Sequence, residues 1–530
     1  MGLHSSLERI LFGVALLLLL LPVWIGPMYL MQDGPRHSDI AHLIEAFLAG
    51  PSPLISQTYE SMFLPLPNWT TYLLLIPLQA LLGDAIAMKV VVSIYVLGLP
   101  LSARVALRWT NAASPEAGWL LLPFVHSLLL SIGLLNFLLA LPLMVLTMGV
   151  TIRLRQHSRG FGWWILLALT TALYFTHPLV LCVTLLCCGI LIGVPALLKR
   201  DALLPKRLFL YTLPSTGLLA WFLVLRHTTD PAGWNHLYST GTRLSWLISN
   251  NLILQSSVWE VYIGALVTLA FTALLFFSLG NQVLDRTLTP NRMTLPLLAV
   301  VLFYFLTPDQ IGGGTLIGLR SQIFVIIAFI FWLAYIPSPN VAKWLTCLAG
   351  LVITAGITGL RVQEQRRMNQ HVAELMKAAN HIPKQNRMLA IHYATTGMWP
   401  NGEPVQGRAR LLASAQALLH PLTQGIELNN SQAHTDDFPI RYLKHLDPFV
   451  HLAEPKAFEE EPPRFDISRF ESQTGVFIDV VLILGRNTHT AGSADKEAPS
   501  DNYTLRWSNS SGFPVEVWVR NTVAKPISAD

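Results

Sequence analysis

The chain has 530 residues, of which 52% are hydrophobic and only 13% are charged. Soluble domains carry about a quarter charged residues, so this deficit indicates a polytopic α-helical membrane protein. The net charge of +5 is small and the positive residues lie in short loops, so we expect no nucleic-acid partner. All four cysteines lie in apolar runs, which excludes a disulfide scaffold or a cysteine zinc site in the polar C-terminal region.

The first predicted element is a membrane helix. Residues 10–32 contain no charged side chain, and that length is sufficient to cross a hydrocarbon core of ~30 Å. A secretory signal would have a shorter apolar region and a small-residue cleavage site, and neither is present. We therefore expect a retained first helix.

Apolar stretches continue to residue 360 and predict about eleven spans. The predicted spans are 8–31, 84–107, 116–132, 134–152, 162–177, 178–198, 208–226, 251–279, 294–308, 316–336 and 342–360. Residues 70–83 are also apolar but short, which indicates a helix that is interfacial or half-buried. The sequence leaves open whether they span or lie in the interface.

The distribution of Lys and Arg predicts the orientation of the spans. If the N-terminus is cytoplasmic, the inner side carries Arg9, Arg104, Arg108, Arg153, Arg155, Arg159, Lys199, Arg200, Lys206, Arg207, Arg286 and Arg292. The outer loops then carry only Arg36, Arg226, Arg243 and Arg320. Short cytoplasmic loops are enriched in Lys and Arg, so this assignment is favoured, and eleven spans place the C-terminal region outside.

Composition changes at residue 361, where we expect a domain boundary between a membrane module (1–360) and an extracytoplasmic α/β domain (361–530). Residues 361–380 are typical of a charged amphipathic helix, and residues 409–419 of a further helix. The predicted strands are 387–393, 476–484, 503–507 and 515–519, the last two forming a hairpin. Residues 486–501 suggest a mobile loop. No phosphate loop, dinucleotide fingerprint or nucleophile elbow is found in this region.

The first outer loop, 32–69, concentrates ionisable side chains directly after the first helix. It contains Asp33, Arg36 and His37, followed by a short amphipathic helix over 38–48 that carries Asp39 and His42. Charged groups at a membrane boundary are costly and by default indicate a functional site. We interpret this loop as the lid and acid–base centre of a membrane enzyme, although Asp33 in its Asp-Gly-Pro context could also serve only as a helix cap or turn residue.

Asp39 and His42 are three residues apart and share a helix face. They could form a hydrogen-bonded pair that fixes the loop, or bind phosphate or a divalent cation together with Asp33. A metal site needs more hard oxygen ligands than the sequence offers, so a Mg²⁺ or Mn²⁺ cofactor is left open. His37 could donate to a phosphate or lie solvated in the loop.

Other unusual polar residues fall on the same predicted side. His177 lies in a Thr-His-Pro turn, and Asp309, Gly312, Gly313, Gly314 and Arg320 lie in or beside a later outer loop. Arg320 is a bidentate partner for phosphate oxygens, and glycine amides can approach an anion closely. The alternative is a flexible loop with an interfacial Arg and a satisfied buried histidine. Trp234, Trp246 and Trp259 are typical of an interfacial aromatic belt.

This pattern resembles the GT-C class of glycosyltransferases. The resemblance rests on Asp33-Gly34-Pro35 with His37, the Gly133–Phe137 hairpin, Thr176-His177-Pro178, and Pro308-Asp309 with the glycines 312–314. These motifs also resemble a group of uncharacterised bacterial membrane proteins. The class takes a sugar from a polyprenyl-phosphate carrier and has an acidic residue after the first helix, a position that Asp33 occupies. Many members carry two nearly adjacent acids there, whereas here the next acid is Asp39, with Asp309 another candidate.

The resemblance implies a transferase of the bacterial inner membrane. The expected partners are a polyprenyl-phosphate-linked sugar donor, membrane lipid and an unidentified lipid, glycan or protein acceptor. The expected roles are catalysis for Asp33 and Asp39, and substrate or phosphate binding for the other named groups. Alternatives are a lipid-linked glycan polymerase or ligase, a transporter, and a non-catalytic membrane assembly partner. A transporter would be expected to have charged or broken helices near mid-membrane, and few ionisable residues lie there.

Overall fold

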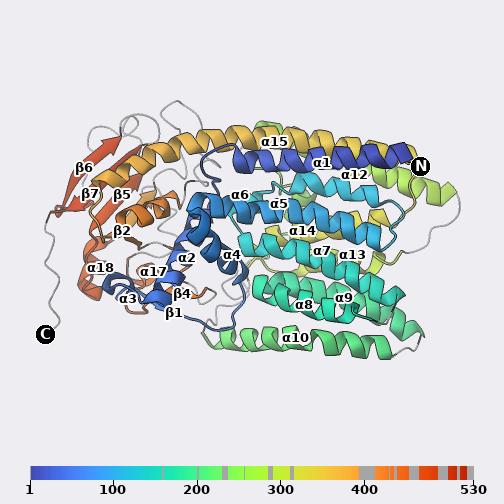
Figure 1. The fold of residues 1–530 in the computed structure, drawn as a ribbon, viewed down its shortest axis with the longest axis horizontal. Helices are drawn as coiled ribbons and strands as arrows, with labels where there is room; N and C mark the ends of the chain where they lie inside the picture. Colours follow the sequence, from blue (N-terminus) through green and yellow to red (C-terminus); the bar gives the residue numbers. More distant parts are fainter. Residues whose placement is uncertain are drawn as a thin grey trace. The chain divides into compact units, whose positions relative to one another are not determined.

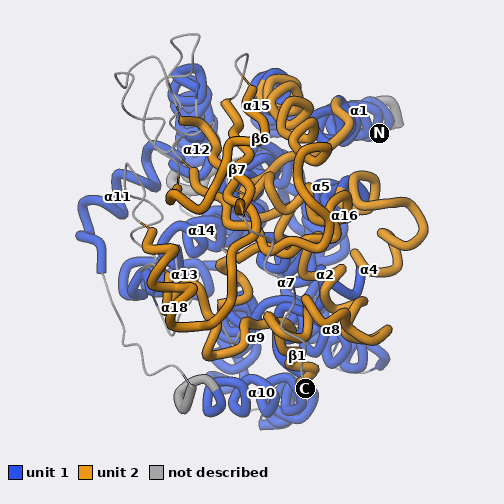
Figure 2. The backbone as a smooth tube through the Cα atoms, turned by 90° about the vertical axis from the view of Figure 1, so that its left-hand side faces the viewer, with its two compact units in different colours: residues 1–25, 65–74, 89–363 blue, residues 26–64, 75–88, 364–530 orange. Residues whose placement is uncertain are grey.

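The structure is a computed structural model, and it describes residues 2–157, 160–199, 202–229, 237–255, 257–284, 291–310, 316–392, 412, 414–428, 430–434, 438–452, 465–486, 499–509 and 514–521. The chain divides into two compact units, which Figure 2 colours separately. Unit 1 comprises residues 1–25, 65–74 and 89–363, and unit 2 comprises residues 26–64, 75–88 and 364–530. The last division falls inside a continuous helix, close to the expected boundary after residue 360, and two N-terminal segments group with the C-terminal region.

Unit 1 is helical. Its helices are α1 (Gly2–Trp24), most of α5 (Asp84–Trp109), η1 (Pro115–Phe124), α6 (Leu128–Ile132), α7 (Leu135–Gln156), α8 (Gly162–Thr176), α9 (Pro178–Lys199), α10 (Leu203–Thr229), α11 (Thr240–Ile248), α12 (Val258–Leu284), α13 (Thr294–Leu306), α14 (Ile317–Ala334) and the first part of α15 (Asn340–Lys377). The start of α4 (Thr70–Leu82) also belongs to it. Figure 1 shows α7, α8 and α9 alongside one another.

Eight helices of the described residues are long and apolar enough to cross a membrane: α1, α5, α7, α9, α10, α12, α14 and α15. Each corresponds to a span predicted from the sequence. The predicted spans 162–177 and 294–308 form the shorter apolar helices α8 and α13, and 70–83 forms the similarly short α4. This confirms the prediction of a polytopic helical membrane protein.

The predicted span 116–132 is wrong. Its residues form the 3₁₀-helix η1 and the five-residue helix α6, separated by residues that include Ser127 in an extended conformation. Pro123, inside η1, lacks the backbone N–H that an α-helical hydrogen bond at this position would need. Leu121 and Leu122 are fully buried within the protein, so the hydrophobicity of this stretch reflects packing among helices and not a membrane crossing.

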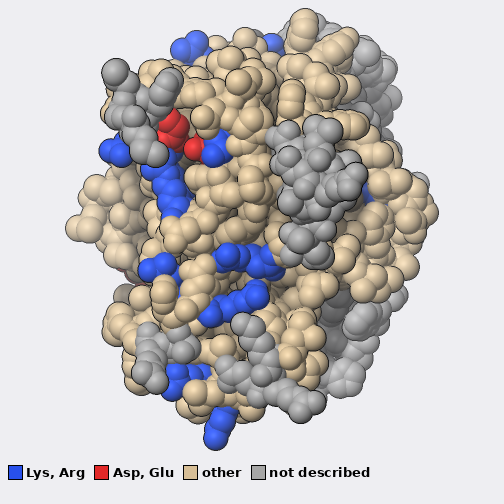
Figure 3. Space-filling view, turned by 90° about the vertical axis from the view of Figure 1, so that its right-hand side faces the viewer, with Lys and Arg blue, Asp and Glu red and all other residues tan. Residues whose placement is uncertain are grey.

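Basic residues gather at one end of unit 1, the end seen face-on in Figure 3. The last turns of α5 and α7 and the start of α10 carry basic residues, among them Arg108, Arg153, Arg155 and Lys206. These residues belong to the set predicted to face the cytoplasm. Their position at one end of unit 1 agrees with the prediction that they lie on one side of the membrane. The assignment of that side to the cytoplasm stays a prediction.

Unit 2 contains a five-stranded sheet of order β3-β2-β5-β7-β6. The strands are β2 (Arg387–His392), β3 (Ile426–Glu427), β5 (Val480–Leu484), β6 (Tyr503–Asn509) and β7 (Val515–Arg520). β2 pairs in parallel with β3 and β5, whereas β7 pairs antiparallel with β5 and β6. A second, two-stranded sheet joins β1 (Tyr59–Ser61) to β4 (Ile440–Tyr442). The helices are α2 (Gly34–Ala49), α3 (Pro53–Ser56), η2 (Ala378–His381), η4 (Ala415–Leu419), α16 (His420–Thr423), α17 (Pro448–His451) and α18 (Ile467–Thr474).

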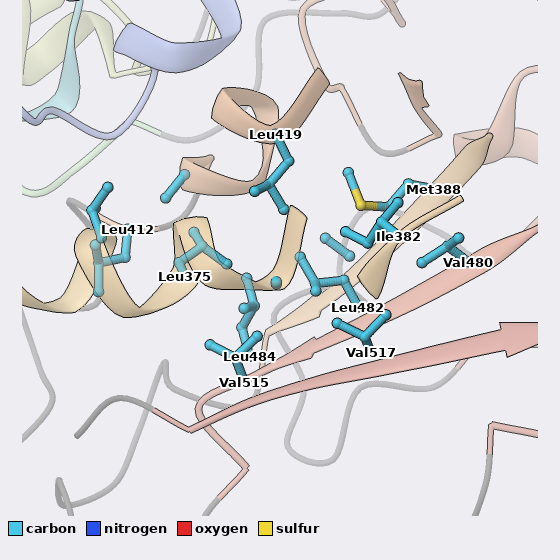
Figure 4. Close-up of a cluster of buried hydrophobic side chains, with 14 of the residues drawn as sticks. Leu375, Ile382, Met388, Leu412, Leu419, Val480, Leu482, Leu484, Val515 and Val517 are labelled. Atoms are coloured by element: carbon cyan, nitrogen blue, oxygen red, sulfur yellow. The ribbon is translucent and has the colours of Figure 1, made fainter. Parts of the chain in front are cut away.

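Alternating side chains of the sheet form two cores. Met388, Leu482 and Val517 pack with Leu375 of α15 and Leu419 of η4, as Figure 4 shows. The intervening residues, including Leu389 and Val481, pack with Phe470 of α18 on the other face. This period of two is the pattern expected of a sheet covered on both faces.

The predicted elements of the C-terminal region are largely confirmed. The strands at 387–393, 476–484, 503–507 and 515–519 correspond to β2, β5, β6 and β7, and the last two form the expected antiparallel pair. The charged helix at 361–380 is the continuation of α15, followed by η2. The predicted helix 409–419 and the predicted mobile loop 486–501 lie partly outside the described residues; within them, Ala415–Leu419 is a 3₁₀-helix.

Candidate functional site

The first cluster of predicted site residues lies at the start of α2, in unit 2. Pro35 occupies the first turn, where its fixed φ suits a helix and its missing N–H has no intrahelical partner to lose. Asp33 is the N-cap residue, but its side chain makes no capping hydrogen bond. Its side chain is 20% exposed, so solvent reaches part of the carboxylate.

Two amide side chains of α15 hold the segment that precedes Asp33. Gln365 accepts a hydrogen bond from the Leu30 N–H (2.9 Å) and donates one to the Leu30 carbonyl (2.8 Å). Asn369 makes the same pair of bonds to Met28, at 3.0 and 2.9 Å. These reciprocal bonds satisfy the backbone as a neighbouring strand would, and they fix the position at which Asp33 enters α2.

Arg36 lies between two carboxylates. Its Nη1 is 4.0 Å from Asp33 Oδ1, and its Nη2 is 3.5 Å from Glu427 Oε1 on β3. Nη1 also donates to the Ser431 hydroxyl at 3.1 Å. The positive charge of Arg36 therefore compensates the negative charges of both the partly exposed Asp33 and the fully buried Glu427.

Glu427 is fully buried and is held from several directions. Gln416 of η4 donates to Glu427 Oε1 at 2.6 Å, and the hydroxyls of Tyr59 and Tyr442 donate to the Glu427 backbone carbonyl at 2.5 and 3.0 Å. Burial of a charge is costly without a partner, so this environment ties Glu427 to the cation of Arg36.

Asp39 pairs with His420 of α16. Asp39 Oδ1 lies 2.8 Å from His420 Nδ1, and the Asn430 amide donates to Oδ2 at 3.5 Å. Burial lowers the pKa of His420, but the adjacent Asp39 carboxylate outweighs it, so the pKa is raised. Asp39 and His420 are both buried, so the imidazole partner of this predicted catalytic acid lies beneath the protein surface.

Two further histidines, His37 on α2 and His392 on β2, belong to the first cluster. His37 is buried, with its Nε2 3.4 Å from the Gln432 amide nitrogen, so it is not a solvated loop residue. His392, at the end of β2, lies 3.2 Å from the Gln416 amide oxygen, and burial together with Arg36 lowers its pKa to about 4. His392 is thus neutral at physiological pH.

His42 does not pair with Asp39, which was one of the alternatives left open. Its Nε2 lies 2.9 and 3.0 Å from the two carboxylate oxygens of Asp84, the first residue of α5. The hydrogen bond to Asp84 raises the pKa of His42. This contact links α2 to the start of α5.

The second cluster lies in unit 1, where α8 ends and α14 begins. His177, between α8 and α9, has its Nε2 3.5 Å from Arg320 Nη1, and its ring makes an edge contact with Phe137 at 5.2 Å. The Arg320 guanidinium also lies 6.0 Å from the Phe137 ring centre. The structure therefore brings together His177 and Arg320, two predicted phosphate-binding residues that are 143 positions apart.

Asp309 supports the first turn of α14. Its Oδ1 accepts a hydrogen bond from the Gly318 N–H at 2.9 Å, and its carbonyl accepts one from Ile317 at 3.1 Å. The buried Arg243 donates to the carbonyls of Tyr304 and Thr307 at the end of α13. Both contacts fix the approach to α14, on which Arg320 lies. Gly312, Gly313 and Gly314 fall outside the described residues.

Among the residues that the structure describes, no group of three or more His, Cys, Asp or Glu side chains is arranged to hold a metal ion. Mg²⁺ is often bound through one or two carboxylates and the phosphates of a substrate.

The sequence reasoning missed the C-terminal half of the first cluster. Glu427, His420, Gln416, Asn430 and Gln432 carry no recognised motif, and they approach α2 only through the tertiary fold. The available signal was the concentration of these polar side chains between residues 416 and 432.

No protein-family model matches the chain, and no curated protein matches it significantly. Among solved structures, the chain is similar to ArnT of Cupriavidus metallidurans in the apo state, with a TM-score of 0.50 and 11% identity over 97% of this chain and 98% of that one. The same protein bound to undecaprenyl phosphate gives a TM-score of 0.49 and 12% identity over 98% and 99% of the two chains.

The first of these similarities extends over nearly the whole chain and shows the fold. ArnT is a GT-C membrane glycosyltransferase, so the predicted fold class, a GT-C-like helical membrane protein with a C-terminal α/β domain, is confirmed.

Proposed function

We propose that this chain is a membrane glycosyltransferase that transfers a sugar, with inversion, from a polyprenyl-phosphate carrier to a lipid, glycan or protein acceptor at the outer face of the membrane. The observation that carries the proposal is the Asp33 carboxylate. It follows the first membrane helix, is partly exposed, is not used as a helix cap, and lies beside a guanidinium. The GT-C-like fold supports the same reaction class.

In the proposed reaction, Asp33 accepts the proton of the acceptor hydroxyl. The hydroxyl oxygen forms a bond to the anomeric carbon of the sugar, the bond from that carbon to the phosphate oxygen breaks, and the carrier leaves as polyprenyl phosphate. General-base catalysis of this kind contributes typically about 10²–10⁴ in rate. Asp39 would act through its pairing with His420, by fixing the helix that carries Asp33.

Phosphate recognition is assigned to Arg320 with His177 in unit 1, because a guanidinium beside an imidazole offers several N–H donors to one anion. Asp309 supports this pair by capping the first turn of α14. Arg36 and His37 accompany Asp33 in unit 2 and could also contact substrate. The contact of His42 with Asp84 instead favours a structural role for His42.

A divalent cation would be held by Asp33 only in the presence of substrate oxygens. Electron paramagnetic resonance of added Mn²⁺ tests this: we expect a bound signal with donor lipid and none without it. Binding to the protein alone would show a complete protein site.

The decisive experiment is transfer by the purified protein, offered a panel of polyprenyl-phosphate sugars. Asp33→Asn should keep its fold and carrier affinity and lose at least about a hundredfold in turnover. Asp447→Asn is a matched control, because Asp447 caps α17 in the same unit and should leave turnover unchanged. Unaltered turnover in Asp33→Asn would reject the general base. Movement of a lipid-linked sugar across the membrane without sugar transfer would favour the transporter alternative. Activity only with oligosaccharides on the carrier would favour a polymerase or ligase.

A further inference from the structure

We propose that unit 1 contains a binding site for a phospholipid whose headgroup carries a primary amine, the chemistry of phosphatidylethanolamine. The site is a small pocket between the start of α1, the end of α5 and η1. Arg108 binds the lipid phosphate at the rim, and Glu116 binds the ammonium group. The site shares no residue with the two clusters described above, and the proposal does not depend on the proposed function.

The pocket combines charged side chains with aromatic rings. Two acids, two arginines and two rings contribute to its lining: Glu8, Glu116, Arg104, Arg108, Phe12 and Trp119. It has room for about one water molecule, a volume that suits an ammonium group and excludes a bulky headgroup. The phosphate and the rest of the lipid must therefore lie outside it.

The pocket lies at the boundary between membrane and water. Arg104 donates two hydrogen bonds to Glu8 near the start of α1, at 2.6 and 2.7 Å. The Trp24 indole, at the end of α1, donates to the Ser93 hydroxyl at 3.0 Å. These contacts show that α1 and α5 run antiparallel beside each other, as Figure 1 also shows. Both helices are candidate spans, so the start of one and the end of the other share the level of the lipid headgroups.

Apolar side chains next to the pocket face the lipid. Leu7 and Ile10 of α1 flank Glu8, and Leu101 and Val105 of α5 flank Arg104. All four are exposed, and on helices that cross a membrane such side chains contact acyl chains. A lipid can therefore reach the pocket from the bilayer, which favours a lipid over a soluble ligand.

Glu8 is compensated without the full use of Arg108. Its carboxylate accepts both hydrogen bonds from Arg104 and a further one from the Trp119 indole at 3.2 Å. Arg108 adds one hydrogen bond from Nη2 at 2.8 Å, and its side chain is 44% exposed. Among the residues that the structure describes, Arg108 makes no other hydrogen bond. Its remaining donors can bind a phosphate oxygen, as guanidinium groups commonly do.

Glu116 supplies the opposite charge. Its Oε2 is buried and has no hydrogen-bond partner within the described part of the chain. A buried carboxylate oxygen without a donor is costly, so this atom is suited to a positively charged donor. A primary ammonium group offers three N–H donors, as the lysine side chain does, whereas a quaternary ammonium group offers none.

The charges of the pocket match a zwitterion. Arg104 and Arg108 carry two positive charges, and Glu8 and Glu116 carry two negative charges, so the sum is zero. A headgroup with only a phosphate would leave Glu116 without a partner. A headgroup with both a phosphate and a primary amine compensates Arg108 and Glu116 together.

Native mass spectrometry of the detergent-solubilised protein tests this specificity. The protein is titrated with phosphatidylethanolamine, phosphatidylcholine and phosphatidylglycerol that have the same acyl chains. We expect phosphatidylethanolamine to bind at least about tenfold more tightly than phosphatidylcholine, because a hydrogen bond to a charged group is lost with the quaternary amine. Equal affinities would show that water alone fills the pocket and would overturn the proposal. Tighter binding of phosphatidylglycerol would overturn it in favour of a simple anion site.

Two substitutions separate the two halves of the site. Glu116→Gln should lower the affinity for phosphatidylethanolamine to that for phosphatidylcholine, which itself should not change. Arg108→Gln should weaken both lipids alike and preserve their ratio, because both contain the phosphate. Both variants should fold, since Glu116 Oε2 has no described partner to lose and Glu8 keeps its bonds to Arg104 and Trp119.

A control variant and a soluble ligand complete the test. Lys343→Gln removes a cation that donates to the Ala113 carbonyl, in the connection between α5 and η1, and should change neither affinity. Glycerophosphoethanolamine has the same headgroup without acyl chains, and it should not raise the melting temperature at concentrations where the lipid does. Equal stabilisation by both would reject a membrane lipid as the ligand. A preference for phosphatidylethanolamine that survives Glu116→Gln would overturn the assignment of the pocket.

Discussion

His420 Nδ1 lies 2.8 Å from Asp39 Oδ1, although 381 positions separate the two residues in the sequence. Both side chains are buried, at 4% and 8% exposure. The contact fastens α2, in the loop that follows the first helix, to α16 in the C-terminal region. Asp33 stands at the start of the same helix, so its position depends on a residue that no local motif connects to it.

This pair should make stability depend on pH. The pKa of His420 is raised by Asp39 above its ordinary value, so the folded state binds this proton more tightly than the unfolded chain does. The stabilisation is therefore complete below the unfolded value of about 6.5 and is lost as pH rises through the folded pKa. We expect the apparent melting temperature of the detergent-solubilised protein to fall between pH 6 and pH 9.

Substitution of His420 should remove part of that dependence. His420→Gln should be less stable at pH 6, because loss of one partner of a buried pair costs about 3–5 kcal/mol, and its melting temperature should decline less toward pH 9. His451→Gln is the control, since the His451 ring hydrogen-bonds to Gln473 at an exposed position. A variant with the same decline as the unaltered protein would assign the pH dependence to other groups.

The positions of most helices and strands could be predicted from the sequence. The contacts between residues that are far apart in the sequence could not. The long apolar runs and the alternating strands are local patterns, and they identified α5, α7, β2 and β7 close to their observed bounds. The prediction of a membrane span at 116–132 failed because apolar residues buried among helices have the same composition as residues that face lipid.

For the candidate site, the sequence identified the α2 side of the first cluster but not the side formed by β3 and α16. The pairing of Asp39 with His42 was plausible from helix spacing, yet each residue found a partner far along the chain, His420 and Asp84 respectively. Spacing along a helix determines which side chains can meet locally, while burial decides which distant charge must be compensated.

Arg320 provides a test of phosphate recognition. Arg320→Gln should weaken binding of polyprenyl phosphate by roughly 10- to 150-fold, because a hydrogen bond to a charged group is worth about 1.5–3 kcal/mol. Arg320→Lys should have an intermediate affinity, since it keeps the charge but loses the planar fork of donors. Titration of the purified protein with fluorescent polyprenyl phosphate measures both.

The matched control for Arg320 is Arg292, which lies over the Tyr335 ring at 4.8 Å and belongs to the predicted inner set. Arg292→Gln should bind the carrier as the unaltered protein does. Equal affinities for Arg320→Gln and Arg292→Gln would remove Arg320 from the phosphate site.

The orientation of unit 1 is tested by the helix α10. Lys206 lies in its first turn and Leu237 follows its end, both are exposed, and one candidate span separates them. In a background without the four native cysteines, Leu237→Cys should react with a membrane-impermeant maleimide in intact cells, and Lys206→Cys only after permeabilisation. The reason is the charge bias: Lys206 belongs to the basic end of unit 1, which the positive-inside rule places in the cytoplasm. The reverse labelling pattern would place the His177–Arg320 pair at the cytoplasmic face and exclude an outer-face transferase. Labelling of both cysteines from one side would show instead that α10 does not cross the membrane.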